Sequence, residues 1–181
     1  YDEFLKGEAA AQEMKASQAG LRRAIAFYEQ AVSLDTAFAQ AWSQLSRART
    51  SLYSNGVPDP ALGEAAQVAE ERARALRPDD PLVYLAAGEI YNSVNPIDNS
   101  RALAEYERGL RLAPDDADLL GAAALLEAWL GRWDDLVPRL ERAAQLDPRS
   151  PAPARRLATA HIFLRQYDAA DTAVDRAIAA A

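Results

Sequence analysis

The sequence has 181 residues, half of them hydrophobic by a count that includes many alanines, and a formal net charge of −7. It contains no cysteine, which excludes disulfides, cysteine-ligated zinc and cysteine nucleophiles. Its one histidine, His161, argues against a histidine-rich metal site. The acidic balance argues against a nucleic-acid partner. No apolar run approaches the roughly 18–20 residues of a membrane span, so we expect no direct membrane insertion.

The first residue is Tyr1 rather than methionine, so we interpret the sequence as a piece of a longer protein. Its basic residues are 18 arginines and only two lysines, a bias that, together with the alanine excess, favours a bacterial source. No secretory signal opens the sequence. The compartment is left open, with the cytoplasm favoured and the periplasm as the alternative.

In chain order, the first irregular stretch is 17–20, which separates an opening helix from an amphipathic segment that starts at Leu21. The runs 54–59 and 95–99 lengthen two later turns. From 117 to 150, two amphipathic segments meet at Gly131, and the stretch closes with Asp147 and Pro148. Apolar residues recur at i, i+3, i+4 and i+7 in these segments, which predicts helices with one buried face each.

The second half of this unit recurs along the whole chain. Its three anchor positions, spaced by four and then three residues, start 42, 36, 34 and 34 residues apart in successive copies. Small or apolar side chains occupy nearly all of these positions, which predicts close packing between helices. The anchors are Ala24, Tyr28 and Ala31; Ala66, Glu70 and Ala73; Ala102, Tyr106 and Gly109; Leu136, Leu140 and Ala143; and Ala170, Val174 and Ala177.

The first half recurs less faithfully, as Trp42-x2-Leu45-Ser46, Tyr84-x2-Ala87-Gly88-x2-Tyr91, Leu120-x2-Ala123-Ala124 and Ala154-x2-Leu157-Ala158-x2-His161. The residues typical of helix starts recur with the same repeat. Capping residues precede prolines at Asp59, Asp80 and Ser150, which predicts helix starts there. Paired aspartates at 115–116 and 134–135 are expected at helix starts, and Pro138 in the first turn of its helix.

The two halves together resemble the tetratricopeptide repeat (TPR), W-x2-L-G-x2-Y…A-x3-F…P. Arg49 and Glu127 stand where that pattern carries tyrosine, and Thr36 replaces its closing proline. The resemblance implies an all-α, right-handed solenoid of about five helix pairs. We expect a single array over 1–181, with units at about 1–38, 39–80, 81–116, 117–150 and 151–181.

In the resembled family, partners usually lie along the concave side, which is built from the first helices. Mapping the family's contact positions onto this sequence predicts a groove for a protein or peptide. Its lining would be Gln40, Ser43, Arg47, Leu82, Leu85, Glu89, Asn92, Leu125, Trp129, Arg155, Thr159, Ile162 and Phe163.

The apolar members of this lining would form an exposed strip, which generally marks an interaction site; the alternative is cover by a neighbouring domain. Trp42 and Trp133 fall at packing positions, whereas Trp129 could equally line the groove or the core. Chaperone-tail receptors of this family hold a terminal carboxylate with basic residues, and Glu89 at a matching place argues against that activity.

Catalysis has no support in the sequence, and we expect no catalytic residue, no metal and no cofactor. The paired aspartates at 79–80, 115–116 and 134–135 fall once in each of the three middle units, which favours helix capping over metal binding. His161 occupies the position of Tyr91, which favours packing.

The leading hypothesis is a non-catalytic module that binds a peptide segment or protein surface. The alternative is a regulatory or sensory segment of a multidomain bacterial transcription regulator, kinase or cyclase. The last helix has an apolar stripe and no polar capping helix after it, so self-association through this helix is a further prediction.

Overall fold

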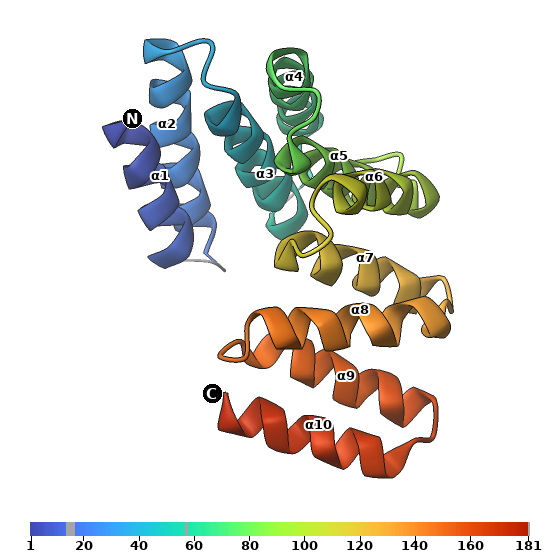
Figure 1. Cartoon of the computed structure of the whole chain (residues 1–181). Helices are drawn as coiled ribbons and strands as arrows, with labels where there is room; N and C mark the ends of the chain where they lie inside the picture. Colours follow the sequence, from blue (N-terminus) through green and yellow to red (C-terminus); the bar gives the residue numbers. More distant parts are fainter. Residues whose placement is uncertain (14–16, 57, 181) are drawn as a thin grey trace. The chain divides into compact units, whose positions relative to one another are not determined.

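The structure is a computed structural model that describes residues 1–13, 17–56 and 58–180. Within these ranges there are ten helices and no strand (Figure 1). The helices are α1 (Asp2–Glu13), α2 (Gln18–Leu34), α3 (Ala39–Asn55), α4 (Pro60–Leu76), α5 (Pro81–Ser93), α6 (Asn99–Leu112), α7 (Ala117–Trp129), α8 (Trp133–Leu146), α9 (Pro151–Phe163) and α10 (Tyr167–Ala179).

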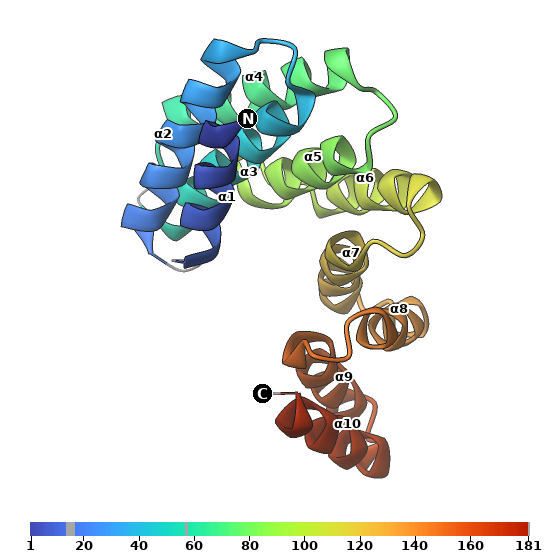
Figure 2. The same cartoon turned by 60° about the vertical axis from the view of Figure 1, so that its left-hand side comes forward.

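The chain forms two compact units, Tyr1–Glu105 and Tyr106–Ala181, and the boundary falls within α6. In the first unit α1 packs on α2, α2 on α3, and α3 on both α4 and α5. In the second unit α7 packs on α8, α8 on α9, and α9 on α10 (Figures 1 and 2). Each unit is therefore a stack of helical hairpins, as the repeated pattern predicts. Whether all pairs form one continuous array stays a prediction.

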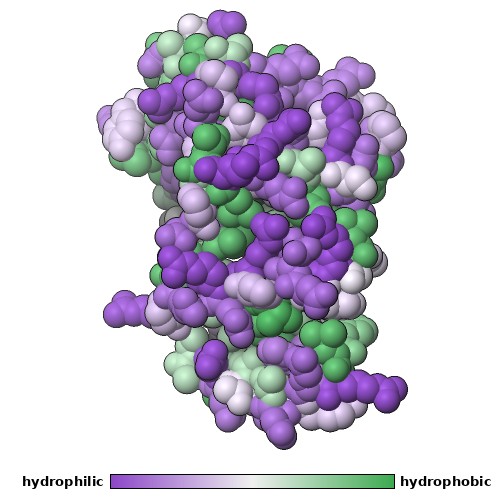
Figure 3. All heavy atoms as spheres, turned by 45° about the vertical axis from the view of Figure 1, so that its right-hand side comes forward, coloured by the Kyte–Doolittle hydropathy of each residue, from purple (hydrophilic) through white to green (hydrophobic). Residues whose placement is uncertain are grey.

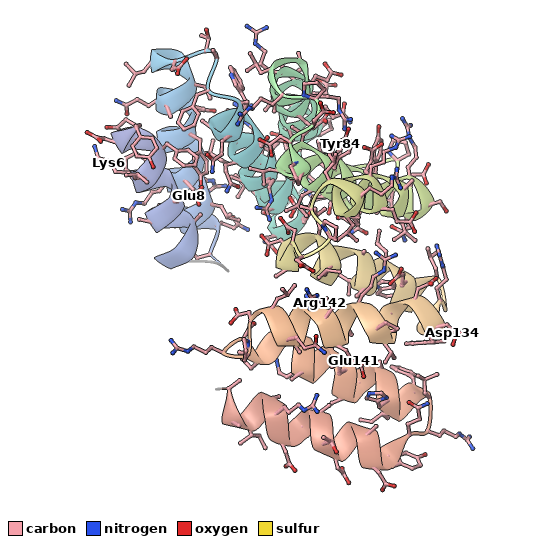
Figure 4. All side chains as sticks on the ribbon, in the orientation of Figure 1. Lys6, Glu8, Tyr84, Asp134, Glu141 and Arg142 are labelled. Atoms are coloured by element: carbon pink, nitrogen blue, oxygen red, sulfur yellow. The ribbon has the colours of Figure 1, made fainter. Side chains whose placement is uncertain are left out.

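The repeated anchor positions form the interior of the hairpins. Every second-helix anchor is buried except Val174, which lies on α10, the last helix of the stack. In the first unit Tyr28 and Leu45 are core residues, and the Tyr28 hydroxyl donates to Glu8 at 2.7 Å. Glu8 lies on α1 (Figure 4). In the second unit Leu136, Leu140 and Leu157 belong to one core cluster. Burial of these apolar faces supplies the main driving force for stacking.

Most of the predicted capping residues lie at helix starts. Asp59, Asp80 and Asp116 are N-caps whose side chains accept from backbone N–H groups of the first turn. Ser150 is also an N-cap, but its side chain makes no capping hydrogen bond. The prediction for Pro138 was wrong: α8 starts at Trp133, so Pro138 lies beyond the first turn. There its missing N–H leaves a helical carbonyl without its usual donor.

The turns differ slightly from expectation. Helix α3 continues to Asn55, so the first two residues of the run 54–59 are helical rather than part of the turn, and residue 57 of this run lies outside the described residues. The turn between α7 and α8 passes through Gly131 with φ of 69°. Because glycine has no Cβ, it enters this left-handed conformation without steric cost, and the chain reverses sharply there.

Candidate apolar pocket in the second unit

A pocket of about 150 Å³ lies among α7, α8 and α9 of the second unit. Its walls are mostly alkyl and aromatic groups, with few polar atoms among them. The lining residues are Ala124, Leu125, Ala128, Trp133, Leu136, Leu140, Arg156, Thr159, Ala160 and Phe163.

Helical spacing brings these residues to one place. On α9, Arg156, Thr159, Ala160 and Phe163 stand at i, i+3, i+4 and i+7, so they share one face of the helix. Leu125 and Ala128 share a face of α7 in the same way. The alanines leave space between the helix backbones, and this space is the pocket.

Two aromatic rings form one wall. Trp133 at the start of α8 stacks on Phe163 at the end of α9, with ring centroids 5.6 Å apart and an interplanar angle of 25°. Trp133 also packs on the core cluster, as its packing position predicted. Phe163 is 68% exposed, so its free side faces solvent.

Arg156 is the one charged residue among the described lining residues. Its Nη1 donates to the carbonyl oxygen of Gly121 on α7 at 3.1 Å. A Cβ built on Gly121 would lie 2.9 Å from that nitrogen, so only glycine leaves the guanidinium its present place. The lack of a side chain at Gly121 on α7 therefore leaves room for the guanidinium of Arg156 on α9.

Further apolar side chains on α7 and α9 are exposed. Trp129 is 77% exposed and Ile162 is 55% exposed, so Trp129 is not a core residue. Figure 3 shows hydrophobic surface among hydrophilic side chains over helices of the second unit. Exposed apolar side chains that gather into a patch favour a binding role.

The predicted groove residues fall into different environments in the two units. In the second unit Leu125, Thr159 and Phe163 line the pocket, whereas Trp129, Arg155 and Ile162 are exposed outside its lining. In the first unit Gln40 is exposed, and Leu82 and Asn92 are half-buried.

Two of the residues assigned to the groove are almost fully buried. Ser43 is 1% exposed and Leu85 is 2% exposed. Ser43 lies on α3 and Leu85 on α5, two helices that pack against each other. Neither side chain presents surface to a partner in this structure, and the predicted lining as a whole stays a prediction.

Arg47 and Glu89, also predicted groove residues, form an ion pair between α3 and α5. The Glu89 carboxylate accepts from Nε of Arg47 at 3.0 and 3.2 Å and from its Nη2 at 3.0 Å. This fork-like geometry is strong and orients both groups. The pair ties neighbouring helices together, so each charge already has a partner within the chain.

The position that carries tyrosine in the TPR pattern is polar in three units, and each side chain has a local partner. Arg49 donates to the carbonyl of Ala65 and to Glu29, at 2.9 and 2.8 Å. Nδ1 of His161 lies 2.7 Å from Oε1 of Gln166, which supports the packing role predicted for it.

Glu127 fills the same position in α7 and is fully buried. Nε of Arg139 lies 2.8 Å from its Oε1, yet neither carboxylate oxygen accepts a well-formed hydrogen bond within the described residues. Burial raises the pKa of Glu127 to about 6, and Arg139 opposes that rise.

Sequence reasoning missed Arg156 as a residue of the pocket, and it missed the contact of Arg156 with Gly121. The helical spacing back from Phe163 points to Arg156, since seven residues separate them on one face. Nothing in the sequence alone indicates that Gly121 faces this arginine, because the two are 35 residues apart.

Over the described ranges, no group of three or more His, Asp or Glu side chains is arranged to hold a metal. The helices that the structure describes include none long and apolar enough to cross a membrane.

Stacked helical hairpins with these buried anchors define the TPR solenoid, and the comparisons agree. No family model and no curated protein matches the sequence. TTC0263, a thermophilic TPR protein of Thermus thermophilus, is similar in structure with TM-score 0.77 and 20% identity, covering 99% of this chain and 91% of that one.

PilW, a widely conserved type IV pilus biogenesis factor, gives TM-score 0.68 at 18% identity, over 98% of this chain and 77% of its own. YrrB, described as a TPR protein with an unusual peptide-binding site, gives TM-score 0.59 at 18% identity, over 96% and 91%. The chain therefore has the TPR fold.

Proposed function

We propose that this chain is a non-catalytic protein–protein interaction module whose second unit receives one apolar side chain of a peptide segment or protein surface. The observation that carries the proposal is the apolar pocket beside the exposed side chains of Leu125 and Phe163. Anchoring a side chain in such a pocket is a common source of binding energy between proteins.

The size of the pocket favours this interpretation. A cavity of about 150 Å³ accepts a group of about the size of benzene. Sites for cofactors or drug-sized ligands are larger, about 300–1,000 Å³. One leucine or phenylalanine side chain therefore suits the pocket better than a cofactor does.

The few polar groups that line the pocket favour a binding role over a catalytic role. Of its described lining residues only Arg156 and Thr159 are polar, and Thr159 Oγ1 donates to the Arg155 carbonyl. A nucleophile paired with a general base, which acyl transfer or hydrolysis requires, is not among these lining residues. The likeness to YrrB, a protein with a peptide-binding site, also supports a peptide-binding role.

A displayed library of random peptides tests the proposal. We expect enrichment of peptides that share one aromatic or large aliphatic residue. Leu125→Ala combined with Trp129→Ala should weaken the selected peptides about tenfold or more, as loss of hot-spot contacts does. Both residues are exposed, so circular dichroism should show an unchanged helix content.

Val68→Ala on α4 is the matched control, because Val68 is an exposed apolar residue of the first unit. It should leave affinity unchanged. No enrichment at all, or equal affinity of the folded double variant and the wild type, would contradict the proposal.

A further inference from the structure

We propose that the pocket selects segments in which a carboxylate side chain lies next to the apolar anchor, and that Arg156, positioned by Gly121, makes this selection. This inference rests on the proposed function, since it concerns the chemistry of the occupant of the same pocket.

The first observation is the place of the guanidinium. Arg156 lines an otherwise apolar pocket, and its hydrogen bond to Gly121 holds it against α7. An arginine offers five N–H donors, and this contact uses one. The remaining donors are available to an anion that arrives with the anchor side chain.

The second observation is the lack of a carboxylate partner. At the start of α8 and along it, Arg132 pairs with Asp135, Arg139 with Glu127, and Arg142 with Asp115. Within the part of the chain that the structure describes, Arg155 and Arg156 on α9 form no such pair. Arg156 therefore brings an uncompensated positive charge to the pocket, in a protein of net charge −7.

Charge complementarity follows from these two observations. A carboxylate beside the anchor would meet the remaining donors of Arg156, and a charge-assisted hydrogen bond is stronger than a neutral one. A lysine in the same place would be repelled. The geometry thus assigns an acidic, apolar peptide to the pocket rather than a basic or neutral one.

The test uses four short unlabelled peptides in a Gly-Ser background, followed by NMR titration of the full chain. Their central residues are Asp-Phe-Asp, Asn-Phe-Asn, Lys-Phe-Lys and Asp-Ala-Asp. The indole N–H signal of Trp133 reports on the pocket. That of Trp42, whose indole donates to Thr36 in the first unit, is the internal control.

We expect the Asp-Phe-Asp peptide to shift the Trp133 signal and to bind about tenfold tighter than Asn-Phe-Asn, the difference of about one charge-assisted hydrogen bond. Arg156→Gln should bring the two affinities together. Gly121→Ala should do the same by displacing the guanidinium, while alanine within a helix keeps or raises the melting temperature.

The outcomes separate the two proposals. Equal binding of all three phenylalanine peptides would overturn the inference and leave the pocket as an apolar anchor site. Equal binding of Asp-Ala-Asp and Asp-Phe-Asp would overturn the anchor itself. No shift of Trp133 with any peptide would overturn both. An unchanged preference for aspartate in Arg156→Gln would reject Arg156 as the selecting residue.

Discussion

Glu127 brings a carboxylate into the interior of the second unit at a position that the TPR pattern gives to tyrosine. Full burial without a well-formed hydrogen bond disfavours its charged form, and Arg139 compensates this cost only in part. Arg132, Asp135 and Glu107 also contribute to the local field. The residue is therefore a source of pH-dependent stability rather than a passive member of the core.

Glu127→Gln should change how stability depends on pH. The folded-state pKa of about 6 lies above the ordinary value of 4.5, so the folded state binds the extra proton between these values. As pH rises through this window, the wild type should lose stability relative to the variant by on the order of 1–2 kcal/mol.

Urea unfolding at several pH values between 4.5 and 7, followed by tryptophan fluorescence, measures this difference. A parallel pH dependence in the two proteins would show that Glu127 has an unshifted pKa. A constant offset between them is expected in any case, because Arg139 loses its partner in the variant.

At the scale of the helices, some helices start with a side-chain capping hydrogen bond and others start without one. Asp80 and Asp116 cap α5 and α7 with hydrogen bonds to backbone N–H groups at 3.0 and 2.9 Å. Ser150 precedes α9 without such a bond, although Pro151 follows it as proline follows Asp80. The first turn of α9 thus depends on proline at its first position and on packing, rather than on its capping side chain.

Because of this difference, alanine substitutions at the two capping residues should lower the free energy of unfolding by different amounts. Asp116→Ala should lower the free energy of unfolding by about 1 kcal/mol, because it removes a cap bond and a carboxylate at the positive end of a helix. Ser150→Ala should have an effect of only a few tenths of a kcal/mol. Thermal unfolding of the two variants makes the comparison, and an equal loss would contradict the geometry at Ser150.

At the scale of the molecule, helices contact mainly their neighbours in sequence. In the first unit the packing runs from each helix to the next from α1 to α5, with α3 also meeting α5, and in the second unit it runs from α7 to α10. In such arrays stability is approximately a sum of unit and neighbour terms, so a local defect weakens its surroundings most. The division into two compact units sharpens this expectation.

Leu157→Ala, in the core of the second unit, should destabilise it by about 2–5 kcal/mol. Amide hydrogen exchange should accelerate in α8, α9 and α10 and change little in α1 and α2. Leu45→Ala in the first unit is the reciprocal control, with the opposite distribution. Uniform acceleration over the chain in both variants would show one cooperative unit instead.

Much of the fold was predictable because the buried positions of a helical repeat recur at fixed spacing in the sequence. Anchors such as Ala24, Leu136 and Ala170 recur with fixed spacing, and each buries the face that the spacing predicts. Pro138 was misplaced because the paired aspartates suggested a later helix start than Trp133. End positions depend on a few weak interactions, so they are less determined than helix existence.

The candidate site was predictable only in part. Leu125, Thr159 and Phe163 were found because contact positions recur with the repeat, and they do line the pocket. Ser43 and Leu85 occupy similar positions but are buried. How closely two first helices approach depends on all the side chains between them, and no single motif position carries that information.

The sequence by itself determined the helix pairs, their order and the residues of their interiors, because helical periodicity and burial are local properties of the chain. Only the tertiary structure decided which residues outside the helix interiors stay accessible to solvent, and which residues far apart in the sequence contact each other. Gly121 and Arg156 show the reason: their contact depends on the distance between two helix backbones, which packing sets and spacing along the chain does not.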